Sequence, residues 1–436
     1  MVLAVININD AGIQVGLDGD LTRTSPGYAV LNNDQLMVGE VAARNARLLP
    51  RWTSNRFWSQ LSTAPMESGT AQVRHHADLA FAHLEDLWQP ISTEATDAIL
   101  IVPGYFSTEQ LGLLLGMARE CQIPVRGIVD HSVVAASNLP LRQNVLHLDI
   151  HLHSMTLSNL SNTGTLARRS AKTIVEIGLA TLWDRWADII ANQFIQTTRF
   201  DPMHEAASEQ RLFDQLPDWV AGLGDETMHT FELEIEGNAH SVAVSHDNLL
   251  RACASLYPQI VQAIRAEIPA GENASLLLSH RLQGFPGLQD SLRLIPEISC
   301  IELAEMKGIG SASLNRDQIM SSDGAISHVT QLQAGDIASD DSVNERTATH
   351  LLWRHHATPI GTQFKLDASL DNGPKRSDNP VATFYTSAGQ LLMDCHQPEQ
   401  LQLNGQQPEA STKLQPGDVL QLQNETLTLI SVGSHG

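Results

Sequence analysis

Positive charge is scarce in this chain of 436 residues. It has 27 lysine and arginine residues against 49 aspartate and glutamate residues, which gives a formal net charge of −22. A field of this sign repels the phosphates of nucleic acids and the anionic surfaces of membranes. The composition therefore predicts a protein that does not bind nucleic acid.

Cysteine pairs and long apolar runs are also missing. The four cysteines lie far apart, and no CxxC motif occurs. We expect reduced cysteines that serve as small buried hydrophobic residues in a cytosolic protein. No apolar run approaches the length that spans a bilayer, and the first residues, MVLAVININDAG, show neither a basic region nor a cleavage site. These features predict a cytoplasmic location and no membrane insertion.

A strand, turn, helix and strand pattern occupies Asp97–Asn138. Ala98–Val102 is a short apolar run typical of a strand buried on both faces, and Val125–Val129 is the next such run. Between them, Ser107 stands at an N-cap position with Gln110 three residues later, a capping-box pattern. A right-handed crossover between two parallel strands is expected, so a ligand would lie at the carboxyl ends of the strands.

Further segments have the periodicity of strands and helices. The expected elements are strands at Val2–Ile8 and Gly12–Leu17, a strand pair within Val145–Leu160, a helix at Gly178–Thr197, a hairpin at Met228–Val244, and one helix at His246–Glu267 capped by Ser245. Together they predict an α/β protein whose length suggests about two to three domains.

A family resemblance begins at Val102–Phe106. This segment and the small-residue helix start at Ser132–Ser137 resemble the "VPAYF" and "EPTAAA" segments of the DnaK-type heat-shock chaperone ATPases, which have the actin-like fold. Ser25–Tyr28 and Met37–Asn45 resemble the family's "TPSYV" and "LIGDAAKNQ" segments. The resemblance covers residues 1 to about 330 and implies the two-lobed ATPase architecture.

The residues that the resemblance assigns to the nucleotide are replaced. Asn7 and Asn9 stand where the family's "IDLGTT" segment has its carboxylate and a glycine, and Asn55 stands where its catalytic lysine would be. In the second phosphate segment Asp149 is retained, but His151–His153 replaces three glycines. Ser279–His280 replaces the paired glycines of the adenosine segment. Because a phosphate cradle needs bare backbone, these side chains are expected to block it.

Strand alternation places His147, Asp149, His151 and His153 on one face. One interpretation is a zinc or iron site made of imidazoles and a carboxylate. The other is a polar filling of a disused cleft. Since neither an HxxxH nor a CxxC partner segment is present, we favour the second interpretation and expect no metal.

The last quarter of the chain differs in pattern. Residues 334–347, AGDIASDDSVNERT, are polar and acidic, as in a linker, and would separate an ATPase-like region at 1–333 from a module at 348–436. That module has short β runs at 349–353, 363–366, 382–386, 390–394, 400–403, 419–422 and 427–431, a spacing typical of an all-β sandwich.

This module resembles a forkhead-associated domain in its start, Pro359–Gly361, and in its final strands. Such domains bind phosphothreonine through an arginine after that glycine and through a Ser-x-x-His segment. Here Thr362 follows the glycine, and Ser377 is followed by Pro380 in place of histidine. Lys375 and Arg376, beside Ser377, could still supply positive charge or form a solvated loop pair.

Three functions follow as hypotheses. The leading one is a non-catalytic, chaperone-like scaffold, a pseudo-ATPase without cofactor that acts through contacts with protein partners. The second is a divergent ATP-hydrolysing switch in which Asp149 orders Mg²⁺ and water. The third is a phosphothreonine adaptor that uses the C-terminal module. On the first hypothesis the chain is not an enzyme.

Overall fold

The computed structural model contains two compact units, Met1–Ala338 and Ser339–Gly436. Each unit is described by itself. The described residues are 2–66, 70–224, 226–235, 237–320, 325–334, 348–354, 356–360, 363–368, 370, 374–375, 377, 380–387, 390–405, 407–408, 411–415, 417–422 and 425–430. The proposed linker, residues 334–347, lies outside the described residues except for Ala334.

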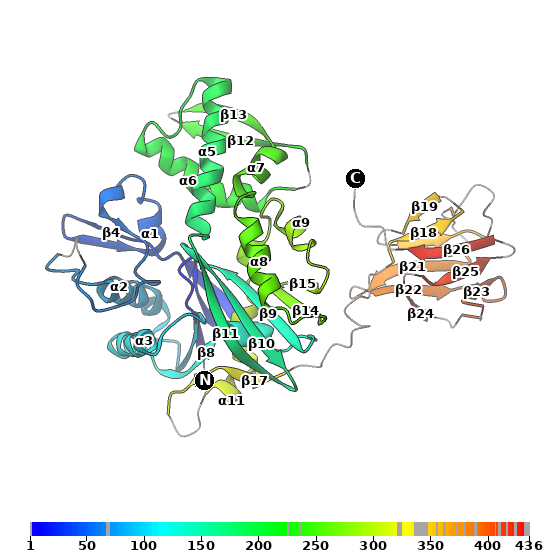
Figure 1. Cartoon of the computed structure of the whole chain (residues 1–436), viewed down its shortest axis with the longest axis horizontal. Coiled ribbons are helices and arrows are strands. Elements are labelled where there is room, and N and C mark those ends of the chain that lie inside the picture. Colours follow the sequence, from blue (N-terminus) through cyan, green and yellow to red (C-terminus); the bar gives the residue numbers. More distant parts are fainter. Residues whose placement is uncertain are drawn as a thin grey trace. The chain divides into compact units, whose positions relative to one another are not determined.

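The first unit is built on two mixed sheets with the same strand plan (Figure 1). The first sheet has the order β16 (His328–Val329), β8 (Val125–Asp130), β7 (Asp97–Val102), β1 (Leu3–Asn7), β2 (Ile13–Leu17) and β3 (Asp20–Ser25). The second has the order β15 (Ile298–Glu302), β14 (Ala274–Leu278), β9 (Asn144–Ile150), β10 (Ser154–Asn162), β11 (Thr165–Val175) and β17 (Gln331–Gln333).

Each sheet starts from an antiparallel meander and continues with parallel strands. The strands β1 and β2 pair antiparallel, while β1, β7 and β8 run parallel. In the second sheet, β9 and β10 pair antiparallel, while β9, β14 and β15 run parallel. The chain therefore repeats one five-stranded arrangement, and the short segment β16–β17 adds an edge strand to each copy.

The predicted crossover at 97–138 is confirmed. Every residue of β7 is buried, as its continuous apolar sequence requires. The helix α3 (Thr108–Glu120) begins after Ser107, whose hydroxyl accepts from the Gln110 backbone, while the Gln110 side chain accepts from the Ser107 backbone. This reciprocal capping satisfies two backbone donors at the start of the helix. The carboxyl ends of β7 and β8 thus face the same way as that of β1.

Three apolar cores hold the unit together. One lies on the outer face of the first sheet and includes α2 (His76–Trp88) and α3. A second lies against the second sheet and includes α5 (Leu179–Thr198), α6 (Ala206–Ala221) and the hairpin β12–β13 (Met228–Ile235, Asn238–Ser245). The third lies between the two sheets, where α4 (His131–Ala136) and α10 (Lys307–Leu314) pack.

The expectation of a single helix at His246–Glu267 is wrong. Ser245 caps it as predicted, but the chain forms α7 (His246–Cys253) and α8 (Tyr257–Glu267) with a turn between them. Pro258 lies in the first turn of α8. A proline has no backbone N–H and its ring crowds the carbonyl four residues earlier, which disfavours a continuous helix here, although α6 contains Pro217.

The expectation that the cysteines are buried is only partly correct. All four are free thiols, as predicted, and Cys253 is buried. Cys121 and Cys395 are half-buried, and Cys300 is exposed because it lies on β15, the edge strand of the second sheet.

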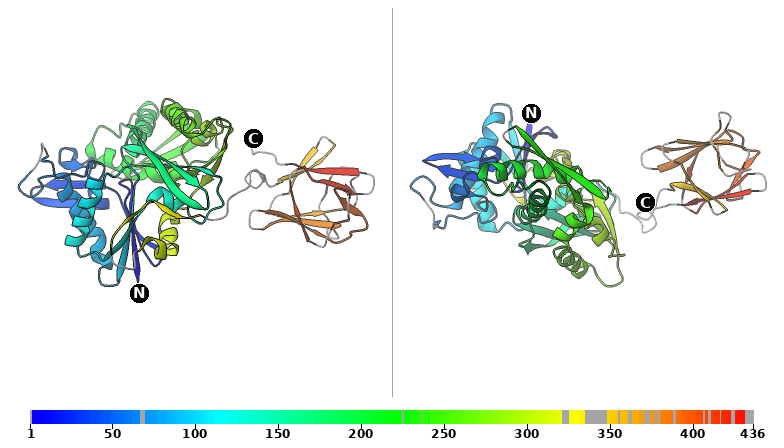
Figure 2. Two further views of the ribbon diagram at one scale, coloured as in Figure 1. Left: turned by 60° about the horizontal axis from the view of Figure 1, so that its bottom comes forward. Right: turned by 90° about the horizontal axis from the view of Figure 1, so that it is seen from above.

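The C-terminal unit consists of two antiparallel sheets around one core (Figure 2). One has the order β19 (His356–Pro359), β18 (His350–Trp353), β26 (Glu425–Ile430), β25 (Val419–Leu422) and β23 (Leu401–Leu403). The other has the order β20 (Gln363–Leu366), β21 (Ala382–Ser387), β22 (Gln390–Cys395) and β24 (Ser411–Leu414). The expected β runs are all strands, and β19 and β24 are additional ones. Within the described residues, no helix has both the length and the apolar character needed to cross a membrane.

We expect the two units to unfold as separate transitions in calorimetry of the whole chain, because each has its own core. Leu429 is fully buried in the C-terminal core and Leu276 is fully buried in the first unit. Leu429→Ala should lower the stability of only one transition, and Leu276→Ala that of only the other, each by about 2–5 kcal/mol. A single transition shifted by both variants would contradict this.

Candidate functional site

The carboxyl ends of β1 and β9 meet the start of α4 and the short helix η3 (His280–Leu282) inside the first unit. Polar side chains that are almost fully buried gather at this point. They are Asn7, Asn9, Asp10, His131, His147, Asp149, His151 and Ser279. Strand ends are where an open α/β sheet places its ligands, so this cluster is the candidate site.

Asp149 is the centre of the cluster. Its Oδ2 accepts from Asn9 Nδ2 at 2.9 Å and lies 3.0 Å from His131 Nδ1. Its Oδ1 accepts from the backbone of Ile150 and lies 3.7 Å from Arg281 Nη1. Burial alone would raise the pKa of this carboxyl group, but the charge and hydrogen bond of His131 and the charge of Arg281 hold the pKa well below its usual range. Asp149 is therefore an ionised group with its acceptors already engaged.

Asp10 is a second buried carboxyl group, and it has few partners. Its Oδ1 accepts from the backbone N–H of Leu152 at 2.8 Å, while its Oδ2 has no hydrogen bond to any of the described residues. Burial raises the pKa of Asp10 to about 6, against the smaller effect of the Leu152 hydrogen bond. The His151 Nδ1 atom lies 3.9 Å from Asp10 Oδ1. Asp10 is thus poised between its charged and neutral forms near neutral pH.

His151 fills the space beside Asp10. Its Nε2 lies 2.9 Å from the hydroxyl of Thr156, and its ring meets the ring of Tyr105 edge to face at 5.1 Å. Burial lowers the pKa of His151 to about 4, so the ring is neutral at pH 7. The next residue, Leu152, is also buried. These two side chains occupy the turn after β9, where the resemblance to the chaperone ATPases implies bare backbone.

A small cavity lies on the other side of Asp149. Asn7, His131, His147, Ser279 and His280 are among its lining residues, and its volume is about 10 Å³. That space corresponds to roughly one water molecule. Burial lowers the pKa values of His147 and His280 to about 3, so both rings are neutral. Within the part of the chain that the structure describes, Asn7 Oδ1, His147 Nε2 and Ser279 Oγ have no hydrogen-bond partner.

The elements around the first sheet, here called the first lobe, also contact the elements around the second sheet, here called the second lobe, at a point away from Asp149. Arg47 donates to Asp184 at 2.7 Å and to Glu209 at 3.2 Å, and its guanidinium lies 3.6 Å from the centroid of the Phe213 ring. His153 Nε2 lies 3.0 Å from Asn55 Oδ1. A cavity of about 540 Å³ remains in this upper part of the cleft, lined by residues that include Tyr28, Arg44, Arg47 and Trp183. Ala11 and Leu152, in the turns after β1 and β9, also line this cavity, so the open space of the cleft reaches these turns, whereas Asp149 is not among the lining residues.

The structure brings together most of the residues that the sequence singled out. Asn7, Asn9, Asp149, His151, Ser279 and His280 lie at the strand ends, and Asn55 with His153 lies nearby in the cleft. In the C-terminal unit, Lys375 is exposed, the Ser377 backbone donates to Lys365, and Arg376 lies outside the described residues. Among the described residues, no group of three His, Cys, Asp or Glu side chains is arranged to hold a metal ion.

Sequence reasoning missed four important residues. Asp10, His131 and Arg281 complete the buried cluster, and Arg47 bridges the upper lobes. The signal for His131 was its place directly after β8, at the carboxyl end of a parallel strand. Arg281 follows β14 in the same way, after Ser279–His280. No pattern in the sequence marks Arg47 as a bridging residue.

Comparisons with known proteins give no family for this chain. A scan against protein-family models finds no match, and a search of curated proteins finds no match either.

We expect Asp10→Asn to stabilise the protein at pH 8 and to lose this advantage at pH 4. The folded-state pKa of Asp10 is raised, so its contribution to stability is present at low pH and is lost as the pH rises through about 6. Asparagine does not titrate, so the difference in unfolding free energy between variant and parent should change by about 1–3 kcal/mol between the two pH values. Urea unfolding at both pH values measures it.

Asp149→Asn is the control, and its effect on stability at pH 8 should have the opposite sign, because the pKa of Asp149 is lowered and that of Asp10 is raised. It removes a paired buried charge and should destabilise the protein at pH 8 by about 3–5 kcal/mol. If Asp10→Asn were equally destabilising at pH 8, the ionised form of Asp10 would be required by the fold, contrary to this interpretation.

Arg47→Lys is expected to weaken the contact that Arg47 makes with α5 and α6. Lysine cannot reproduce the two forked contacts or the stacking on Phe213, so the variant should lose about 1–2 kcal/mol of stability. Arg44→Lys is the matched control, because Arg44 pairs only with Glu40 on an exposed helix surface. It should cost less than about 0.5 kcal/mol. Equal effects of the two variants in chemical unfolding would refute the bridging role.

Proposed function

We propose that residues 1–333 form a two-lobed domain of actin-like, DnaK-type architecture without nucleotide chemistry, and that the chain is a non-catalytic scaffold acting through protein contacts. The duplicated strand order supports the architecture, since both sheets carry the same five-stranded plan and the lobes face each other across α4 and α10. Two of the segments that resemble the chaperone ATPases, the turns after β1 and β9, follow the corresponding strands of the two sheets.

The observation that carries the proposal is the filling of the strand ends. Only about 10 Å³ of open space remains beside Asn7, His147 and Ser279. Drug-sized ligands occupy pockets of about 300–1,000 Å³. A triphosphate would have to displace His151 and Leu152, both of which are buried in well-packed surroundings.

The hydrogen-bond donors that a phosphate needs are also engaged. The backbone N–H of Leu152 donates to Asp10 Oδ1, and that of His151 donates to the Ser154 carbonyl. At the first turn, the backbone N–H of Ala11 donates to Asn9 Oδ1. An anion site depends on free N–H groups in a concave backbone. Here the side chains of Asp10 and Asn9 take the place that phosphate oxygens would occupy.

The divergent-switch alternative is not favoured by these interactions. A metal and a water could bind Asp149 only after its carboxylate had lost its contacts with Asn9, His131 and the Ile150 backbone.

For the C-terminal unit, we propose a degenerate forkhead-associated-like sandwich that binds partners without phosphate. Its two antiparallel sheets on one core support this architecture.

The purified chain is expected not to bind Mg-ATP with micromolar affinity and not to hydrolyse it. Removing one preorganised hydrogen-bond donor from a site that stabilises an oxyanion costs about 2.7–4 kcal/mol, and several such donors are unavailable here. Isothermal calorimetry and thermal-shift measurements with Mg-ATP, Mg-ADP and free ATP test this. The melting temperature should not move with any of them.

A dissociation constant below about 10 μM, near −7 kcal/mol, would overturn the proposal. If a nucleotide did bind, Tyr28→Ala and Trp183→Ala would separate the two places available. Loss of binding in these variants would locate the ligand in the upper cavity, and unchanged binding would locate it at the strand ends, after repacking of His151.

A further inference from the structure

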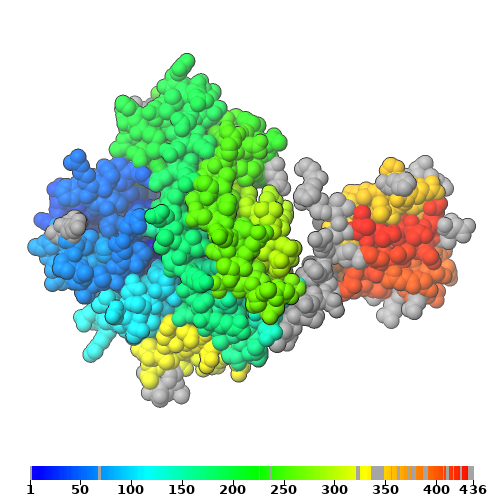
Figure 3. All heavy atoms as spheres, viewed as in Figure 1, coloured from blue at the N-terminus to red at the C-terminus, as the bar shows by residue number. Residues whose placement is uncertain are grey.

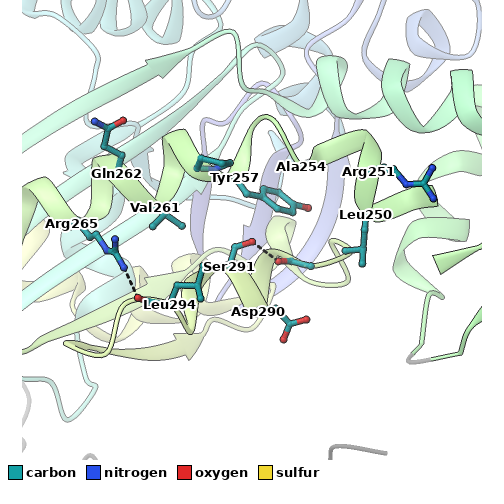
Figure 4. A pocket seen from close by; sticks show the side chains of 12 residues that line it. Leu250, Arg251, Ala254, Tyr257, Val261, Gln262, Arg265, Asp290, Ser291 and Leu294 are labelled. Atoms are coloured by element: carbon teal, nitrogen blue, oxygen red, sulfur yellow. Dashed lines mark hydrogen bonds between the residues drawn. The ribbon is translucent and has the colours of Figure 1, made fainter. Parts of the chain in front are cut away.

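A groove with a volume of about 630 Å³ lies on the surface of the second lobe. It runs between α7–α8 on one side and α9 (Leu288–Leu292) on the other (Figure 4). These helices lie at the molecular surface, where their lime-coloured atoms are visible in Figure 3. The groove shares no lining residue with the strand-end cluster.

The walls of the groove have helical spacing. On the first wall the lining positions Leu250, Ala254, Tyr257, Val261 and Arg265 follow one another three or four residues apart, and this stripe continues across the break between α7 and α8. The opposite wall repeats the pattern with Gly287, Asp290, Ser291 and Leu294. Two parallel stripes of this kind form the groove into which the ridge of a third helix packs.

Hydrogen bonds and a close contact hold the floor of the groove in place. The Tyr257 hydroxyl donates to the Pro286 carbonyl at 2.7 Å, and the Ser291 hydroxyl donates to the Gly287 carbonyl at 2.8 Å. Gly287 has a positive φ of 72°, and a Cβ at this position would lie 2.2 Å from a methyl group of Leu250. Glycine thus allows the two walls to approach. A groove that is already formed spares a partner the cost of ordering it.

The groove is apolar in its middle and positive at its ends. Figure 4 shows Arg251 at one end and Arg265 at the other, with Tyr257, Val261 and Leu294 between them. Arg265 donates to the Leu294 carbonyl, and within the described residues neither arginine has a carboxylate partner. Asp290 is already paired with Arg293 at 2.8 Å. The groove thus offers two arginines without a carboxylate partner among the described residues, on a chain with a net charge of −22.

We propose that this groove binds an acidic amphipathic helix of a partner protein. The apolar middle fits leucine-type anchors at helical spacing, and the two arginines fit glutamates near the ends of the same helix. A partner helix of about 14 residues, roughly 20 Å long, would be longer than α8, which has 11 residues. Leu294, which is 65 % exposed, would be covered by that helix. The inference rests on the proposed scaffold function and names the partner class.

The test uses labelled helical peptides of about 18 residues, the length needed to span the groove with one extra turn. The first has leucines on one face and glutamates near both ends, the second has lysines in place of the glutamates, and the third has the leucines distributed around the helix. Fluorescence anisotropy with the full chain measures binding. The acidic amphipathic peptide should bind at least about tenfold more tightly than the other two, because only it matches both groove features.

Variants of the chain assign the binding to the groove. Leu294→Asp should weaken binding of the acidic peptide about tenfold or more, as expected for a central apolar contact. Leu314→Asp is the matched control, because Leu314 is 78 % exposed but does not line the groove. The double variant Arg251→Glu, Arg265→Glu should prefer the lysine peptide.

Three outcomes would overturn the inference. They are no binding of any peptide, equal binding of the acidic and basic peptides, and binding that Leu294→Asp leaves unchanged. Self-association of the chain that Leu294→Asp abolishes and Leu314→Asp does not would identify a second copy as the occupant instead. None of these outcomes alters the Mg-ATP result, so failure of the groove and failure of the scaffold proposal can be told apart.

Discussion

The first unit depends on how one buried carboxylate, Asp149, is stabilised. A charge buried at this depth is tolerated only when it is paired and hydrogen-bonded. Its partners come from separate parts of the chain: Asn9 from the turn after β1, His131 from the start of α4, and Arg281 from η3. These interactions join the first sheet to the second at the bottom of the cleft. Removing any one partner would leave a costly charge between the lobes.

The same interactions explain why the architecture can persist without a ligand. In a nucleotide site, phosphate and metal neutralise the polar groups at the strand ends. Here the protein's own side chains do so. Asn9 donates a hydrogen bond to the Asp149 carboxylate, and Asp10 accepts one from the backbone N–H of Leu152. Arg47 joins the two lobes at a second point through its contacts with Asp184 and Glu209. On the proposed scaffold function, the surfaces that remain for recognition are the groove beside α8 and the C-terminal sandwich.

Much of the fold could be predicted from local patterns. The continuous apolar run of β7, the capping box at Ser107 and the alternation after Val145 each depend on neighbours a few residues away, and each appears in the structure as expected. The break before Pro258 is also a local effect, because proline lacks the backbone N–H group that a helix interior uses. Exposure of Cys300 could not be read locally, because it depends on β15 lying at a sheet edge.

The sequence by itself determined which residue types stand at the strand ends, because the identity of a residue needs no tertiary structure. It thus determined that Asn7 ends β1 and that His151, with a side chain, follows β9. Only the tertiary structure decided which side chains satisfy the buried polar groups instead. Asn9, His131 and Arg281 reach Asp149 from 140, 18 and 132 residues away along the chain, and no local pattern encodes such pairings. The apolar groove arises likewise because α8 and α9, which are separated by β14 and η3 in the chain, line it together in the folded protein.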